Sequence, residues 1–160
     1  MKIRHQLTYA ASPTEVYEMR ADPAFRAQVC EAMDTLSHDV TVDDTDGELT
    51  IAVDMVQHTQ GVPSFAKKVV GDQTRVIQTE RWPAVDAGHI EVEIPGKPGH
   101  IRGTLSLSEA GDGSVYVFDG EARINIPLIG GKLEGLIEKL FIEGMDTEQR
   151  VAAAWLGGLR

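Results

Sequence analysis

The sequence has few of the residues from which cross-linked or metal-bound frameworks are built. Its 160 residues include one cysteine, Cys30, which excludes an intrachain disulfide and a zinc site made of cysteines. No run approaches the ~18 consecutive apolar residues of a membrane-spanning helix, and the first residues lead into no apolar stretch, so no signal peptide is expected. A lone cysteine is typical of a reducing compartment, and we expect a cytoplasmic protein.

Positive charge is scarce as well. Lys and Arg number 15 against 25 Asp and Glu, which leaves a net charge of -10. Because nucleic acids and anionic membranes both attract clustered cations, we expect no nucleic-acid partner and no stable membrane insertion. The hydrophobic fraction of 42% and the charged fraction of 25% are ordinary for a globular domain. We expect a single domain over residues 1–160, long enough to bury a core unaided.

Alternation of apolar and polar residues predicts seven strands, and the short turn-like segments between them predict an antiparallel meander. The acidic run 43–48 contains Asp-Gly, which is typical of a hairpin turn. The strands are expected at residues 2–9, 36–42, 48–57, 73–82, 88–94, 100–108 and 114–126.

Helix signals occur at the two ends of this strand series. Ser12 with Glu15 forms a capping box, and Asp22 begins a second helix, so two short helices follow the first strand. From Leu133 to Leu156, apolar residues recur every three or four positions, and Glu134, Glu138, Glu143 and Glu148 lie mostly on the opposite, solvent side. This spacing predicts one amphipathic helix of about 25 residues, long enough to cover a sheet face.

This order of elements resembles the helix-grip fold of START-like domains, the relatives of the birch pollen allergen and of the polyketide cyclase/lipid-transport superfamily. Three segments carry the resemblance: Tyr9–Tyr17 (YAASPTEVY), Glu80–Pro83 (ERWP) and Ile126–Glu134 (IPLIGGKLE). The last two most resemble an uncharacterised actinobacterial family within this superfamily. The resemblance implies an α+β fold in which a curved, seven-stranded antiparallel sheet and a long helix enclose an apolar cavity. It implies binding of lipids, sterols, polyketides or other hydrophobic molecules, and it supplies no catalytic motif that maps onto this chain.

Strand pairing predicts which side chains face that cavity. A turn at residues 83–87 places Glu80 opposite Ile90 and Gln78 opposite Val92. The same reasoning at the 43–48 turn pairs His38 with Val53 and points His38 inward. A slip of one residue would invert every assignment. The predicted cavity-lining, ligand-binding residues are His38, Met55, Gln78, Glu80, Trp82, Tyr116, Phe118, Leu136, Leu140 and Phe141.

The leading functional hypothesis is non-catalytic binding or carriage of a small hydrophobic ligand, with no cofactor and no metal. The alternative is an enzyme of cyclase/dehydratase or hydrolase type, in which Glu80 and His38 act as an acid–base pair and an apolar pocket raises the pKa of Glu80. A third hypothesis is a partner-binding or chaperone-cofactor module without a ligand. Residues 62–71 are expected to form a connector, with a mobile lid as the alternative. The pattern specifies neither the ligand nor the oligomeric state.

Overall fold

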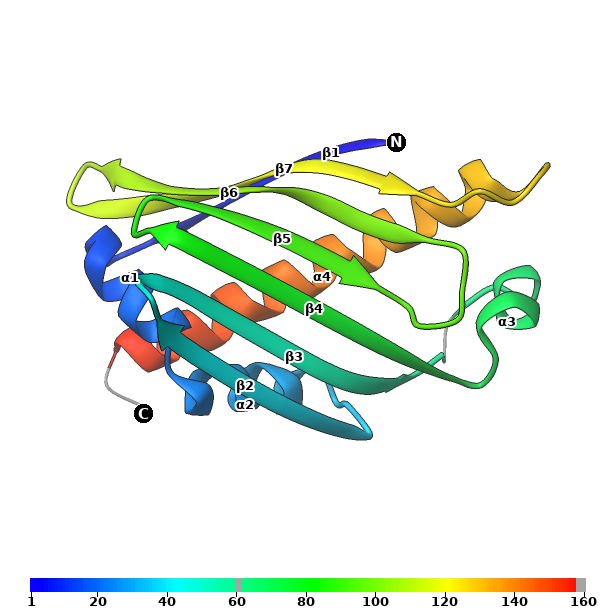
Figure 1. Cartoon of the computed structure of the whole chain (residues 1–160), viewed down its shortest axis with the longest axis horizontal. Helices are drawn as coiled ribbons and strands as arrows, with labels where there is room; N and C mark the ends of the chain where they lie inside the picture. The colour runs from blue at the N-terminus through cyan, green and yellow to red at the C-terminus, as the bar shows by residue number, and fades with distance from the viewer. Residues whose placement is uncertain (60–61, 158–160) are drawn as a thin grey trace.

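Seven antiparallel strands form one sheet in the computed structural model, which describes residues 1–59 and 62–157. The sheet order is β1-β7-β6-β5-β4-β3-β2, so the first strand pairs with the last (Figure 1). This architecture confirms the predicted α+β helix-grip fold. The strands are β1 (Lys2–Tyr9), β2 (Ser37–Thr45), β3 (Glu48–His58), β4 (Gln73–Ala84), β5 (Ala87–Glu93), β6 (His100–Ala110) and β7 (Gly113–Arg123).

Two short helices connect β1 to β2, as the caps predict. In α1 (Pro13–Arg20) the Ser12 hydroxyl accepts a hydrogen bond from the Glu15 backbone N–H, and the Glu15 carboxylate accepts one from the Ser12 N–H. In α2 (Pro23–Ala32) the Asp22 carboxylate accepts a hydrogen bond from the Ala24 N–H. These caps fix where each helix begins, and therefore which of its faces points into the molecule.

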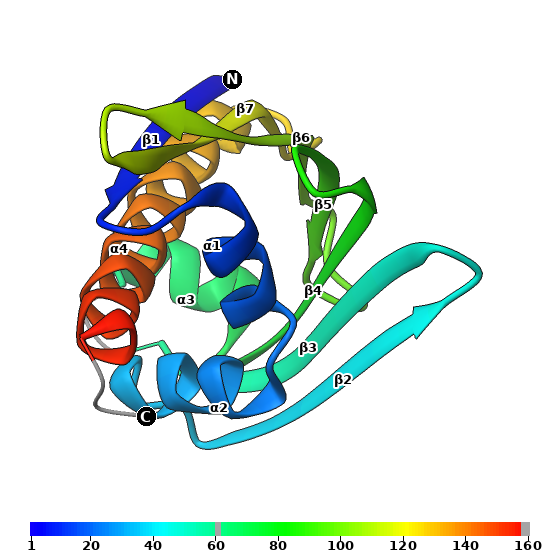
Figure 2. The same ribbon diagram turned by 90° about the vertical axis from the view of Figure 1, so that its left-hand side faces the viewer.

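The long helix α4 (Gly130–Leu156) packs across the concave side of the sheet. Figure 2 shows the sheet curving from β1 and β7 round to β3 and β2, with α4 and α2 closing the ring. Buried apolar side chains from both layers fill the space between them, including Ile51, Leu105 and Ala152. None of the described helices combines the length and the apolar composition needed to cross a membrane.

The strand register explains which predicted side chains point inward. The predicted pairs of Glu80 with Ile90 and of Gln78 with Val92 are confirmed. The predicted register of β2 against β3 is wrong by two residues, because the turn consists of only Asp46 and Gly47, with φ of 55° and 74°. Positive φ at both positions is typical of a tight hairpin turn. A shift of two residues keeps every side chain on its predicted face.

The connector between β3 and β4 contains a helix that the sequence pattern did not reveal. Residues of α3 (Ser64–Val70) form two short turns, and Gly71, with a φ of 81°, ends them. Figure 1 shows α3 at the end of the sheet opposite α1. The helix therefore stands at one end of the interior space.

Candidate functional site

A cavity of about 240 Å³ lies between α4 and the concave face of the sheet. Its walls are mainly apolar, and they come from β3, β4, β5, α2 and α4. Representative lining residues are Val53, Val76, Val92, Ile137 and Phe141. A mainly apolar hollow bordered by helices and several strands has the form of a small-molecule site.

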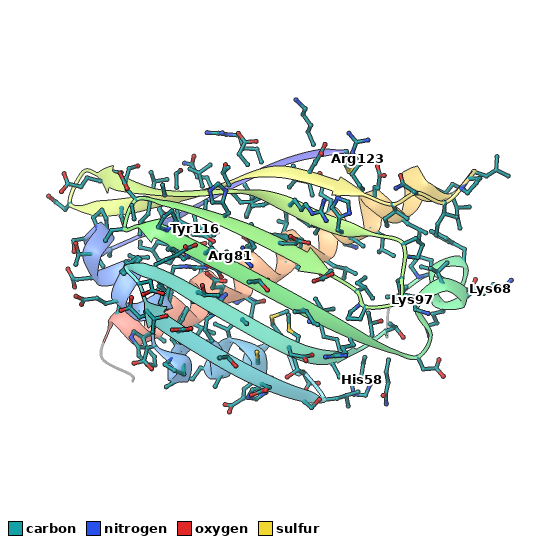
Figure 3. All side chains as sticks on the ribbon, viewed as in Figure 1. His58, Lys68, Arg81, Lys97, Tyr116 and Arg123 are labelled. Atoms are coloured by element: carbon teal, nitrogen blue, oxygen red, sulfur yellow. The ribbon has the colours of Figure 1, made fainter. Side chains whose placement is uncertain are left out.

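The cavity reaches the surface beside α3. Val62, Ala66 and Val69 line it beside this helix, the loop between β5 and β6 contributes Lys97 and Pro98, and His100 lines it from the start of β6. Lys97 is exposed to solvent while also bordering the cavity. Figure 3 places Lys97 and His58 toward the α3 end and Tyr116 toward the α1 end. The cavity therefore has a mouth near α3 and an inner end near Tyr116.

Four ionised side chains form the wall beyond the inner end, and we call Arg20, Arg26, Glu80 and Glu148 the charge cluster. They come from α1, α2, β4 and α4, and each is at most 6% exposed. Arg26 and Glu148 border the cavity directly, together with Gln78 and Tyr116. The charge cluster thus links all four elements at the place where the cavity ends.

Hydrogen bonds within the charge cluster converge on Glu80. Arg20 Nη2 donates to both of its carboxylate oxygens at 2.8 and 2.9 Å, and Arg26 Nη2 donates to Oε2 at 3.0 Å. Trp82 Nε1 donates to Oε1 at 3.0 Å, and Gln78 Nε2 donates to Oε2 at 3.3 Å. Glu80 therefore accepts from four side chains.

The second carboxylate closes the charge cluster. Glu148 Oε1 accepts a hydrogen bond from Arg20 Nη1, and Glu148 Oε2 lies 2.9 Å from Arg26 Nη1 as an ion pair. The Arg20 guanidinium also lies over the Tyr116 ring, 4.4 Å from its centroid, in a cation–π contact. Two positive and two negative charges leave the charge cluster without net charge.

This arrangement keeps Glu80 ionised. Burial alone would raise its pKa, but the charges of Arg20 and Arg26 lower the pKa of Glu80 to about 2. The predicted rise in the pKa of Glu80 is therefore wrong, because sequence reasoning took its surroundings to be apolar. Burial alone would lower the pKa of Arg20, but the carboxylates of Glu148 and Glu80 hold it well above its ordinary value.

Six of the predicted site residues border the cavity, and four do not. Glu80, Trp82 and Phe118 lie in the packed core beyond its walls. Trp82 fills the space beside Gly88, and the rings of Phe118 and Phe141 pack with their centroids 4.8 Å apart. Ligand contact by the six stays a prediction. The six are Met55, Gln78, Tyr116, Leu136, Leu140 and Phe141.

His38 lies on the face predicted for it, but it does not border the cavity. Its side chain is exposed, and its Nδ1 lies 3.4 Å from the Thr35 hydroxyl. His38 sits on β2, the edge strand of the sheet, opposite Met55. An imidazole at an edge stays hydrated, which costs less free energy than burial without a partner. His38 and the fully buried Glu80 therefore do not form an acid–base pair.

Sequence reasoning missed Arg20, Arg26 and Glu148, although a signal was present. Arg20 follows Val16 by four residues, and Arg26 precedes Cys30 by four, so both arginines share a helix face with buried apolar residues. Glu148, expected on the solvent side of α4, precedes the buried Ala152 by four. Together with an inward Glu80, these charges on apolar faces indicate a balanced buried network.

Comparison with known proteins places the chain in an uncharacterised group with a well-known fold. It is 28% identical over 118 residues to the uncharacterized protein Rv0481c of Mycobacterium tuberculosis, covering 69% of this chain and 67% of that protein. A START superfamily protein from Mycobacterium smegmatis has a TM-score of 0.58 at 13% identity and covers 97% of this chain and 98% of its own. The di-domain ARO/CYC StfQ of the steffimycin biosynthetic pathway has a TM-score of 0.65 at 12% identity and covers 96% of this chain and 49% of its own.

These similarities confirm the START-like fold predicted from the order of elements. A family described as "Protein of unknown function (DUF2505)" matches residues 4–156, nearly the whole chain. The chain belongs to this family, whose function its description leaves open.

Proposed function

We propose that the protein binds and carries a small hydrophobic molecule in the cavity without transforming it chemically. The single observation that carries this proposal is the apolar hollow of about 240 Å³ under α4, open beside α3. START-like folds commonly bind hydrophobic ligands, and the walls of this cavity have the matching chemistry.

The size of the cavity narrows the class of ligand. A dry apolar cavity of about 150 Å³ accepts benzene, so about 240 Å³ accommodates an apolar body on the order of ten non-hydrogen atoms. Drug-sized ligands occupy pockets of roughly 300–1,000 Å³. A small aromatic or short aliphatic molecule fits this interior better than a complete sterol, and a longer one would extend through the mouth.

The residues proposed to contact the ligand divide by chemistry. Met55, Leu136, Leu140 and Phe141 supply apolar contact along the walls. The polar contacts at the inner end would come from Gln78 and Tyr116. Glu80, Trp82 and Phe118 act indirectly, since they shape and support the inner wall.

The geometry gives no support to catalysis by Glu80 and His38. A carboxylate with a pKa of about 2 that already accepts hydrogen bonds from four side chains is a weak base and is no acid at neutral pH. His38 is exposed on the edge strand and does not border the cavity. These contacts favour carriage without chemistry over catalysis by this pair.

Titration with a hydrophobic fluorescent dye tests the proposal, together with a variant that fills the cavity. Gly144 lies on α4 and borders the cavity, and a Cβ added there would meet only Met33 Cε, at 3.5 Å. Gly144→Leu should therefore occupy the hollow and weaken dye binding at least tenfold. Native mass spectrometry of the wild-type protein after mild extraction should also reveal a bound small molecule.

A matched control separates filling of the cavity from stiffening of the helix. Gly135 lies on the same helix but does not border the cavity, and an added Cβ there would meet only Met1 Cε, at 3.9 Å. Gly135→Leu should bind dye like the wild type. Absence of saturable dye binding by the wild type, or equal binding by the Gly144→Leu variant, would refute the proposal.

A further inference from the structure

Tyr116 stands out among the residues at the inner end of the cavity. It is 2% exposed and borders the cavity from β7. Its ring is held by the cation–π contact with Arg20 and by the rings of Tyr9 and Trp82, each 6.4 Å away. Its hydroxyl nevertheless makes no hydrogen bond with the part of the chain that the structure describes.

A hydroxyl at the wall of an apolar cavity that has no partner within the chain is costly, and a ligand atom that accepts its hydrogen bond removes that cost. None of the neighbouring polar groups bonds to it: Gln78 and the two arginines donate to Glu80 and Glu148, while Arg20 Nε and Arg26 Nη1 are buried without a hydrogen-bond partner. Burial also keeps the pKa of Tyr116 well above its ordinary value, so the hydroxyl retains its proton and can donate. Tyr116 borders the cavity at its inner end, together with Arg26, Gln78 and Glu148.

The charge cluster restricts what can take that position. Arg20 and Arg26 are already matched by Glu80 and Glu148. A ligand carboxylate at the inner end would meet Glu148, and the charge of Arg26 is already paired with Glu148 although Arg26 Nη1 makes no hydrogen bond. A ligand amine would meet Arg26 without gaining a free anion. Either ion would lose its hydration without a compensating partner. An uncharged oxygen needs only one donor.

We infer that Tyr116 is the specificity-determining residue of the cavity, donating a hydrogen bond to an uncharged oxygen, such as a ketone, at the inner end of a small apolar ligand. This inference rests on the proposed function and adds the chemical class of the ligand. The expected preference is modest, since one neutral hydrogen bond changes affinity about fivefold.

Two probes that differ only in this oxygen test the inference. Acetylnaphthalene and ethylnaphthalene, substituted at the same ring position, have similar apolar bodies, and only the first has a carbonyl. Their affinities are measured by displacement of a bound hydrophobic dye. Tyr116→Phe should weaken binding of the ketone about fivefold and leave binding of the hydrocarbon unchanged.

The chain offers close control variants. Tyr9 is also buried and also has a hydroxyl without a partner, but it does not border the cavity, so Tyr9→Phe should change neither affinity. Thr74 borders the cavity near α3 with a buried, unpartnered hydroxyl. If Thr74→Val rather than Tyr116→Phe removes the preference for the ketone, the oxygen binds near the mouth and the inference is wrong.

The experiment distinguishes failure of the Tyr116 inference from failure of the proposed function. If the wild type binds both probes and Tyr116→Phe changes both affinities equally, or neither, the assignment to Tyr116 is overturned while the proposed function stands. If the wild type binds neither probe nor any hydrophobic dye, the proposed function fails and the inference fails with it. Circular dichroism of the Tyr116→Phe variant checks that its fold is intact, as expected when the deleted hydroxyl has no partner to lose.

Discussion

The two ends of the interior are built from the same sheet and the same helix, yet they differ in almost every property. Toward α1, the space is filled by Trp82, Tyr116 and the charge cluster. Toward α3, the space is hollow and lined by small and medium apolar side chains. One concave surface therefore contains a packed half and an open half.

The comparison indicates that one half stabilises the fold and the other half is available for binding. Ion pairs that connect α1, α2, β4 and α4 hold the long helix against the sheet at one end. The other end can then stay open without loosening the fold. We expect changes in the packed half to alter stability, and changes in the open half to alter binding.

The largest expected effect is the loss of one charge from the packed half. Glu80→Gln leaves Arg20 and Arg26 with a single carboxylate, Glu148. Breaking a buried ion-pair network in this way costs about 3–5 kcal/mol. Urea unfolding followed by circular dichroism measures the difference in free energy of unfolding.

An exposed glutamate provides the matched control. Glu109 lies at the exposed end of β6, and its carboxylate forms no hydrogen bond or ion pair within the described part of the chain. Glu109→Gln should change the free energy of unfolding by no more than about 0.5 kcal/mol. Equal effects of the two substitutions would show that the charge cluster does not hold the packed half together.

Acid should weaken the packed half in the same way. The folded-state pKa of Glu80 is about 2, below its ordinary 4.5, so its contribution to stability is complete above pH 4.5 and is lost as the pH falls toward 2. The free energy of unfolding should fall by about 3 kcal/mol over this pH range. Urea unfolding at a series of pH values measures it, and the Glu80→Gln variant should lack this component. A variant with the same acid sensitivity as the wild type would assign the loss to other carboxylates.

Much of this comparison was accessible from the sequence. The order of strands and helices, the pairing of β4 with β5 and the inward position of Glu80 all follow from alternation and turn chemistry, because these are local signals. The helix-grip fold follows from the resemblance of that order to START-like domains. The three other members of the charge cluster lie 54 to 68 residues away from Glu80 in the chain. Periodicity identifies the face of each element but does not show which faces meet.

The boundary between the packed and open halves could not be predicted for a related reason. Glu80, Gln78 and Val76 share one face of the same strand, but Glu80 is enclosed by arginines while Gln78 and Val76 border the cavity. Whether an inward residue meets a void or a partner depends on side-chain volumes across the whole layer. His38 illustrates the same limit, since its face was predicted but its position at an edge strand leaves it hydrated.

A pair of identical substitutions tests the packing difference directly. At Gly88, a Cβ would lie 2.7 Å from Trp82 Cδ2, so Gly88→Ala should destabilise the protein by about 1–3 kcal/mol. At Gly144 the nearest atom is 3.5 Å away, and Gly144→Ala should stabilise the protein by up to about 1 kcal/mol through helix propensity. Thermal unfolding measures both, and effects of the same sign would contradict the division into packed and open halves.

The smallest effect is expected at the edge strand. His38→Ala removes an exposed side chain that belongs to neither half. It should change the free energy of unfolding by less than about 0.5 kcal/mol and leave dye affinity unchanged. A loss of dye binding would show that His38 contributes to the cavity and would contradict its assignment as an exposed edge residue.

The most direct test of the two-part interior is a crystal structure determined under xenon pressure, since xenon enters dry apolar cavities without needing a specific ligand. The account predicts xenon between α4 and the strands β3, β4 and β5, beside Val76, Val92 and Ile137, and none within the charge cluster. A structure with no xenon in this space, or with xenon only toward α1, would contradict it.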